Sequence, residues 1–170
     1  TGYAYSDDLS PEKIRHAAQV AALIASGPSK VGKIPLHEGP KRNLYPVITA
    51  PSETEFRERV QLAQRADKAA REYDQVQAVY ADNLRQVLVA TSDGVLNFDR
   101  QPLARMSVFA LAKDATGVPQ QGHAGGGGRY ELDYFRNDKT PEYFAKEAAR
   151  QAIMQLGAAE APAGEQVVVL

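Results

Sequence analysis

The sequence predicts an α+β fold in which an antiparallel β-sheet of about five strands, arranged as a meander, is flanked by three α-helices. Three segments repeat apolar residues at the period of a helix, whereas residues 76–113 largely alternate them at the two-residue period of a strand. The tripeptide Ser92-Asp93-Gly94 separates two of these strands and is a strong hairpin signal. Strands joined by such short turns are expected to pair antiparallel.

The composition is that of an ordinary globular protein. Hydrophobic residues make up 44% and charged residues 24% of the 170 positions, a length that suits one domain or a large share of one. The formal net charge of −1 gives no general attraction to nucleic acid or to an anionic membrane, so neither is expected as a partner. Without cysteine the chain has no disulfides and no thiolate metal ligands, and we expect a cytoplasmic protein.

The first helix is expected to begin at Ser10-Pro11 and to end at Gly27-Pro28. Serine is a good N-cap, and proline at the first helical position loses only an amide that has no helical partner. The segment 27–51 then contains four prolines before Pro51. It is predicted to be a long surface loop with one short extended stretch at 44–49.

The second helix is predicted to follow a capping box formed by Ser52 and Glu55, in which each side chain accepts from the backbone amide of the other residue. Apolar residues at helical spacing from Phe56 to Tyr73 indicate a helix of about 20 residues. The third helix is expected to begin at Thr140-Pro141 and to end at Gly157.

Between these two helices, strands are expected at 76–80, 87–90, 95–98 and 104–113, with a turn at Asp82-Asn83. The chain also opens with strand-like alternation and closes with four large apolar residues, 167–170. Because natural termini are usually polar, both ends are expected to continue into more protein. The alternative for residues 167–170 is a docked C-terminal strand of a complete protein.

The three histidines, His16, His37 and His123, are too far apart in sequence to form a helical metal pair. Glu12 and His16 are four residues apart, but a zinc site needs three or four ligands and no further ligand is near. No Gly-x-Ser-x-Gly nucleophile elbow occurs either. The residues therefore predict no catalytic and no metal-binding constellation.

A run of four glycines, Gly125 to Gly128, needs an explanation, because glycine costs conformational entropy. A phosphate-binding loop is one interpretation, although no Gly-Lys-Ser/Thr follows. A strand or loop pressed against another backbone, such as an extended peptide added edge-on, is the second. A flexible connection is the third, and the residues alone leave all three open.

Four stretches carry a resemblance to a known family: residues 1–7 (Thr-Gly-Tyr-Ala-Tyr-Ser-Asp), 89–94 (Val-Ala-Thr-Ser-Asp-Gly), 125–129 (Gly-Gly-Gly-Gly-Arg), and a last one running from Ala145 to Leu170. In their order and spacing they resemble the TldD/PmbA family of metallopeptidases, once described as gyrase modulators, and the TldD branch most of all. The resemblance extends over essentially the whole chain.

The resemblance implies that residues 1–170 are a single piece, the C-terminal portion of the family's N-terminal domain. In that family a His-Glu-x-x-x-His zinc motif follows this segment, and its Glu activates a zinc-bound water for peptide hydrolysis. The catalytic C-terminal domain and its zinc are therefore expected to be absent here. No residue of this chain is expected to be catalytic, and the chain alone should be inactive.

The resemblance also implies partners: the remainder of the parent protein, a second copy or a paralogous subunit in a homodimer or heterodimer, and a peptide substrate. We expect Gly125, Gly126, Gly127, Gly128 and Arg129 to line the substrate cleft and to offer backbone hydrogen bonds to an extended peptide. Arg129 would grip a substrate carboxylate or brace the loop. The alternative is a stand-alone binding module that uses the glycine-rich loop for an anionic ligand.

Overall fold

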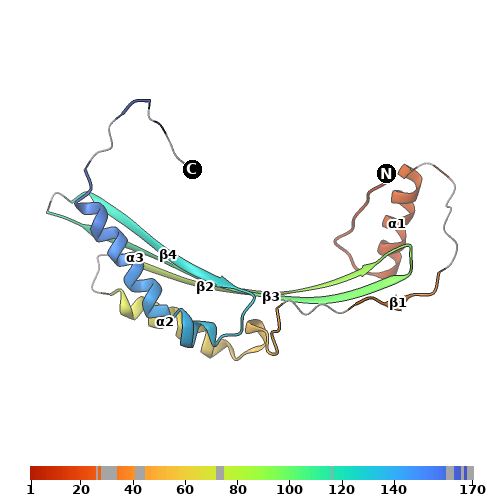
Figure 1. Ribbon diagram of the computed structural model, residues 1–170, viewed down its shortest axis with the longest axis horizontal. Helices are drawn as coiled ribbons and strands as arrows, with labels where there is room; N and C mark the ends of the chain where they lie inside the picture. Colours follow the sequence, from red (N-terminus) through yellow and green to blue (C-terminus); the bar gives the residue numbers. More distant parts are fainter. Residues whose placement is uncertain are drawn as a thin grey trace. The chain divides into compact units, whose positions relative to one another are not determined.

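The computed structural model describes residues 1–25, 27, 34–40, 45–71, 75–115, 117–159, 163–165 and 167 (Figure 1). The chain divides into two compact units, the first made of Thr1–Gly39 and Val89–Leu96 and the second of Pro40–Leu88 and Asn97–Leu170. The elements in chain order are α1 (Pro11–Ala25), β1 (His37–Glu38), the short helix η1 (Pro51–Glu53), α2 (Phe56–Ala69), β2 (Gln75–Ala90), β3 (Val95–Lys113), β4 (Pro119–Gly128), the π-helical turn η2 (Tyr134–Asp138) and α3 (Pro141–Leu156).

The four described strands form one sheet, in which β3 pairs with each of the other three. Strand β4 runs antiparallel to β3 from the pair Ala104 and Gly128 to the pair Lys113 and Pro119. Strand β1, in contrast, runs parallel to β3 through His37 and Glu38. The sheet is therefore mixed, and the prediction of a purely antiparallel meander is wrong in this respect. The long connection that contains β1 imposes no antiparallel direction, whereas a tight turn does.

The strands are fewer and longer than predicted in the described part of the chain. The predicted strands 76–80 and 87–90 are one 16-residue strand, β2, and the predicted strands 95–98 and 104–113 are one 19-residue strand, β3. The expected turn at Asp82 is absent because the Asp82 carboxylate accepts hydrogen bonds from Arg59 of α2 at 3.1 and 3.3 Å. A residue typical of turns serves here as the partner of a helix. Most of the apolar run 167–170 lies outside the described residues.

In the first unit, the turn between β2 and β3 holds β1 in place. Gly94 has a φ of 90° and its carbonyl accepts a hydrogen bond from the His37 amide at 2.9 Å. A Cβ at Gly94 would lie 2.7 Å from the Pro35 carbonyl oxygen, so glycine is required by both the backbone conformation and the close approach. The helix α1 begins at Pro11 as predicted, but none of its residues is buried.

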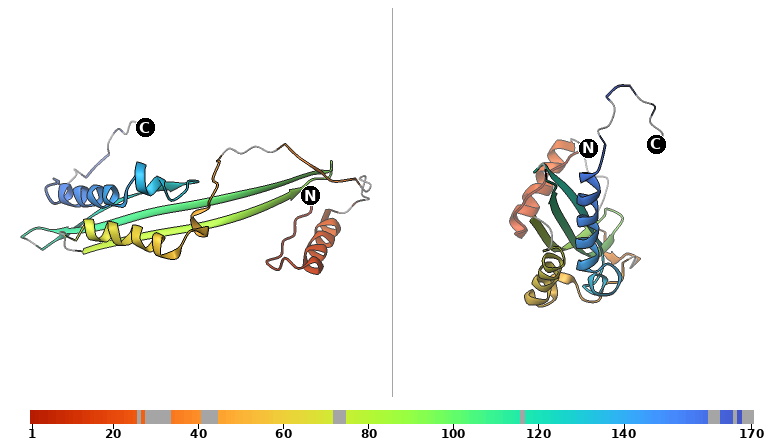
Figure 2. Two further views of the ribbon diagram at one scale, coloured as in Figure 1. Left: turned by 90° about the horizontal axis from the view of Figure 1, so that it is seen from below. Right: turned by 90° about the vertical axis from the view of Figure 1, so that its left-hand side faces the viewer.

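In the second unit, one face of the sheet packs against α2 and α3 (Figure 2). The even-numbered residues Ala104, Met106, Val108 and Ala110 of β3 are fully buried, as expected for alternating side chains on a strand with one covered face. The helices contribute Leu62 and Ala66 from α2, and Phe144, Ala145, Ala148 and Ala149 from α3.

The helix termini show which of the predicted helix starts and caps are present in the structure. The Thr140 hydroxyl accepts from the Tyr143 amide at 3.3 Å and Pro141 occupies the first turn, so the predicted start of α3 is confirmed. The predicted capping box at Ser52 is wrong, because residues 51–53 form η1 and α2 starts only at Phe56. Instead, the carboxylate of Glu53, a residue of η1, accepts a hydrogen bond from the Ala50 amide at 3.1 Å. Helix α2 has 14 residues and is therefore shorter than predicted.

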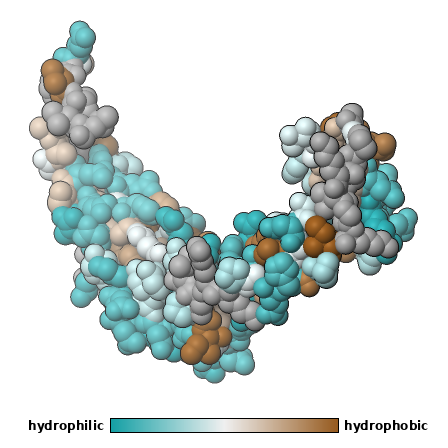
Figure 3. Space-filling model, turned by 45° about the vertical axis from the view of Figure 1, so that its right-hand side comes forward, coloured by the Kyte–Doolittle hydropathy of each residue, from teal (hydrophilic) through white to brown (hydrophobic). Residues whose placement is uncertain are grey.

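On the face drawn in Figure 3, apolar side chains form small separate patches among hydrophilic ones. No helix in the described part of the chain is both long and apolar enough to cross a membrane.

Candidate functional site

The four glycines form the end of strand β4, and this run is called the glycine strand below. Gly125, Gly126, Gly127 and Gly128 pair in register with residues 107, 106, 105 and 104 of β3. The glycines are thus part of a sheet and do not form a loop that precedes a helix. That geometry argues against a phosphate-binding loop, which requires turning backbone at a helix N-terminus.

On the covered face of β4, glycine is needed because α3 lies very close. A Cβ at Gly122 would overlap the carbonyl oxygen of Ala148. A Cβ at Gly126 would lie 3.0 Å from Cζ of Phe144, which is closer than ordinary van der Waals contact. Gly122 and Gly126 therefore have a structural role, because the lack of a side chain lets α3 pack closely against β4.

On the other face, glycine is needed because β4 lies close to β3. A Cβ at Gly125 would be 2.7 Å from the Met106 carbonyl oxygen, and one at Gly127 would overlap the Ala104 carbonyl oxygen. Gly127 also has a φ of 148°, a conformation that L-residues rarely adopt. The glycine strand can pair with β3 in this geometry only as bare backbone.

The outer edge of β4 is unpaired within the described residues. Strand β4 pairs with β3 alone, and no other backbone hydrogen bond joins it to a described segment. An unpaired edge presents alternating amide and carbonyl groups, which are a template for a further strand. The glycine strand therefore offers a backbone ladder with no side chains between the ladder and an incoming chain.

The residues that follow the glycine strand contact the segment that leads to η1. The Arg129 guanidinium lies 4.8 Å from the centre of the Tyr45 ring, a cation–π contact. Tyr130 stacks on Tyr134 at 4.5 Å with an angle of 6° between the rings. The Glu131 carboxylate accepts from the Ile48 amide at 2.7 Å and from the Thr49 amide at 3.3 Å.

These contacts bear on both predicted roles of Arg129. The cation–π contact braces Arg129 against Tyr45, but no ion pair with a carboxylate of the described residues is present. Its positive charge is not neutralised within this part of the chain. Arg129 is thus held beside the glycine strand with its charge available to an anionic group.

Sequence reasoning found the glycines and Arg129 but missed Tyr45 and Glu131. Glu131 is 83 residues from Ile48, and no local pattern indicates that a carboxylate serves backbone amides so far away in sequence. An aromatic residue in a proline-rich segment likewise gives no signal of its partner.

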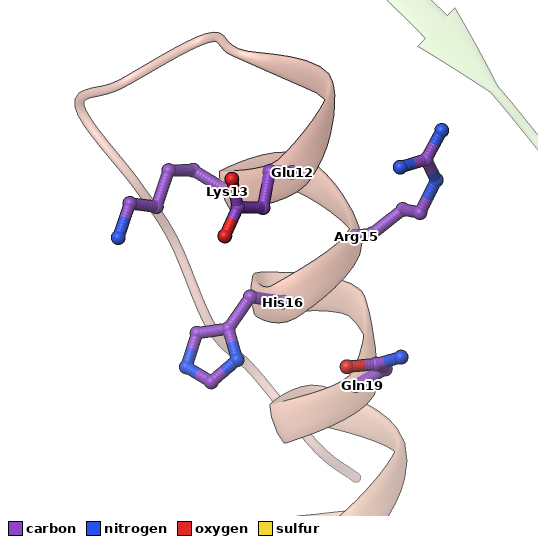
Figure 4. A pocket seen from close by; sticks show the side chains of 5 residues that line it. All are labelled: Glu12, Lys13, Arg15, His16 and Gln19. Carbon is purple, nitrogen blue, oxygen red and sulfur yellow. The ribbon is translucent and has the colours of Figure 1, made fainter.

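The histidines do not come together in a metal site. His16 and Glu12 lie along one side of α1, beside Lys13, while Arg15 points away (Figure 4). The His123 ring of β4 lies 4.4 Å from the Phe109 ring of β3, with the two ring planes tilted by 32°. Among the described residues, no group of three or more His, Cys, Asp or Glu side chains could hold a metal ion. The residues present therefore do not fit a catalytic zinc.

Comparison with known proteins gives consistent results. Residues 49–156 match a family model described as the PmbA/TldA metallopeptidase central domain. A metalloprotease TldD homolog of Buchnera aphidicola subsp. Schizaphis graminum is 31% identical over 180 residues, which cover 100% of this chain and 37% of that protein. A metalloprotease TldD homolog of Haemophilus influenzae is 31% identical over 186 residues, again with 100% and 37% coverage. The chain therefore spans little more than a third of these relatives.

Among solved structures, a Thermotoga maritima protein carrying the provisional description of a modulator of a DNA gyrase has a similar fold. The TM-score is 0.64 at 22% sequence identity, and the match covers 91% of this chain and 34% of that one.

Proposed function

This chain belongs to the PmbA/TldD metallopeptidase family, and from that membership we propose that it is a non-catalytic portion of a peptidase that holds an extended peptide substrate. In this proposal the glycine strand lines the substrate cleft. The observation that supports it is the edge of β4 with which no described segment pairs, where bare backbone is followed directly by a cation, Arg129.

The edge of β4 suits a peptide of varied sequence. Main-chain hydrogen bonds supply affinity in strand addition, and they do not depend on the side chains of the added strand. Glycine at successive positions keeps side chains of the protein out of the way of those of the peptide. Arg129 then adds one preference, for a peptide with a carboxylate beyond the end of the glycine strand.

The hydrolytic groups are assigned to other parts of the parent protein. The described residues do not assemble a metal site, so the metal and the general base are proposed to come from sequence outside this chain. The remainder of the parent protein is then an obligatory partner. Assembly as a homodimer, or as a heterodimer with a paralogous subunit, is proposed on family membership alone.

Strand addition is tested best on the substrate, because the glycines cannot be changed without disturbing the fold. Valine at Gly126 or Gly127 would collide with Phe144 or with the Ala104 carbonyl, and lost activity would then report misfolding. Peptides N-methylated at single backbone positions remove one ladder hydrogen bond at a time. In the complete protein we expect KM to rise roughly tenfold at alternate positions of the peptide and to change little at the others.

A rise in KM without this alternation would contradict pairing with β4. The phosphate interpretation makes a different prediction, a phosphate-dependent rise in the melting temperature of this chain. Because the glycines lie in a strand, we expect no such rise.

The role of Arg129 has its own test. Arg129→Gln in the complete protein should raise KM about ten- to hundredfold for peptides with an acidic residue near the end of the glycine strand. KM for the matched amide peptides should be nearly unchanged. Arg105→Gln, on exposed β3 surface, is the matched control. Equal losses on acidic and amide peptides would assign Arg129 a purely structural role.

A further inference from the structure

The segment 45–50 contacts the residues that follow the glycine strand, and it is called the strap below. Its C-terminal end is fixed, because Ala50 is 2% exposed and its amide donates a hydrogen bond to the Glu53 carboxylate at 3.1 Å. The remainder is largely exposed to solvent, with exposed fractions of 53% for Tyr45 and 87% for Ile48. A segment that buries so little surface opens at a low cost in free energy.

Two attachments hold the strap beside the end of the glycine strand. The Tyr45 ring carries the Arg129 guanidinium at 4.8 Å from its centre. Three residues later, the amides of Ile48 and Thr49 both donate to Oε1 of Glu131, at 2.7 and 3.3 Å. Hydrogen bonds from backbone amides to a carboxylate are charge-assisted and stronger than those between neutral groups. The strap thus engages the cation through a ring and the anion through its backbone.

Without the strap, Arg129 and Glu131 are natural partners for one another. They are two residues apart and carry opposite charges. Two residues of chain span at most about 7 Å, and both side chains are long, so an ion pair between them is within reach. No such pair is present among the described residues, because the Glu131 carboxylate is turned to the strap amides instead.

A carboxylate of the protein that pairs with Arg129 competes with a carboxylate of the substrate for the same guanidinium. We propose that the strap is a switch for this site: when docked it keeps Arg129 available to the substrate, and when released it lets Glu131 occupy Arg129. Tyr45 and Glu131 are then positioning residues, which act on the substrate through Arg129. This inference rests on the proposed function, because it requires a peptide carboxylate to meet Arg129.

The contacts that differ between the two states are weak enough for a switch. An exposed cation–π contact and an exposed ion pair each change an equilibrium by only about two- to fivefold. The docked and released states are therefore close in free energy, and the loss of one contact shifts their populations measurably.

The test compares KM in the complete protein for a peptide with an acidic residue near the end of the glycine strand and for its matched amide. Tyr45→Leu removes the ring under Arg129 and should raise KM for the acidic peptide roughly three- to tenfold. KM for the amide peptide should be unchanged. Tyr45→Phe keeps the ring face and should restore both KM values of the unaltered protein.

A second substitution separates competition from damage to the fold. Glu131→Gln keeps a carbonyl oxygen for the amides of Ile48 and Thr49, but it removes the negative charge that would occupy Arg129. Added to Tyr45→Leu, it should return KM for the acidic peptide to within about twofold of its original value. A strap that merely braces the fold predicts a further rise in KM for the double variant, and that result would overturn the proposal.

Hydrogen exchange of the segment 45–50, followed by mass spectrometry in the complete protein, reports the strap itself. Exchange should be faster in Tyr45→Leu than in the unaltered protein and Tyr45→Phe, and equal rates in all three would refute the switch.

The two proposals fail in different ways. Equal losses on acidic and amide peptides in Arg129→Gln remove the role of Arg129 and this inference with it. If Arg129→Gln discriminates between the peptides but Tyr45→Leu does not, only the strap proposal is overturned.

Discussion

At Gly122 a side chain is excluded by the backbone of α3, and this makes the position a sensitive test of packing. A Cβ there would overlap the Ala148 carbonyl oxygen, so Gly122→Ala must push α3 away from β4. We expect a loss of about 1–3 kcal/mol in the free energy of unfolding, as for other overpacked cores. Urea denaturation followed by circular dichroism measures it.

Gly157→Ala provides the control for that experiment. Gly157 ends α3 with a φ of −97°, and a Cβ there would approach no atom closer than 4.0 Å. Its substitution should change stability by a few tenths of a kcal/mol at most. Equal effects at Gly122 and Gly157 would show that α3 does not lie as close to β4 as described.

At the same scale, the sequence indicates which residues are unusual but not always why. The glycine run is visible in the sequence, and close approach of another backbone is one of its three interpretations. The sequence could not predict that the approaching backbones belong to α3 and β3. Gly122 and Ala148, for example, are brought together only by the tertiary fold. Arg129 stands out through its place after the glycines, whereas its contact with Tyr45 has no sequence signal.

At the scale of elements, α2 and α3 are joined by a two-pronged ion pair. Arg65 donates from Nε and Nη2 to the two oxygens of Glu142 at 2.7 and 2.8 Å. The hydrogen bonds from Arg65 lower the pKa of Glu142 below its ordinary 4.5, and partial burial opposes them only in part.

The pH dependence of stability follows from the sign of that shift. As the pH falls, the unfolded chain takes up the proton at Glu142 before the folded chain does. The contribution of the pair is therefore complete above about pH 4.5 and is lost as the pH falls through the lowered pKa. Glu142→Gln should reduce the drop in melting temperature between pH 6 and pH 3.

Arg65→Met should also reduce the drop in melting temperature between pH 6 and pH 3. The double variant should show the same drop as either single variant, because both substitutions remove the same interaction. Additive effects of the two substitutions would contradict the pairing of α2 with α3 through these side chains.

The elements also show where local patterns are sufficient. The cap at Thr140 needs only neighbouring residues, and its prediction is confirmed. The strands β2 and β3 are each divided in two by the sequence pattern, because Asp82 and Asn83 are typical of a turn and the residues from 99 to 103 are mostly polar or proline. The tertiary ion pair between Arg59 and Asp82 overrides that local preference. The two-residue strand β1 is too short for any periodicity to show.

At the scale of the whole molecule, we expect the chain to be inactive as a peptidase. The described residues offer no cluster for a metal ion, and the chain covers only 37% of the length of its metalloprotease relatives. Incubation with casein and added zinc should give no fragments on gel electrophoresis, and dialysed protein should retain far less than one zinc per chain. Digestion of casein together with stoichiometric zinc would refute the assignment of the hydrolytic groups to other sequence.

Each of the other described strands pairs with β3, and we expect this to set an order of events in folding. The pairing of β2 with β3 closes a short connection and that of β3 with β4 another, so both cost little chain entropy. Strand β1 has only two paired residues and reaches β3 across a connection that includes α2 and the whole of β2. Its docking must follow the formation of the hairpin, and it should be the first strand to detach when the protein opens.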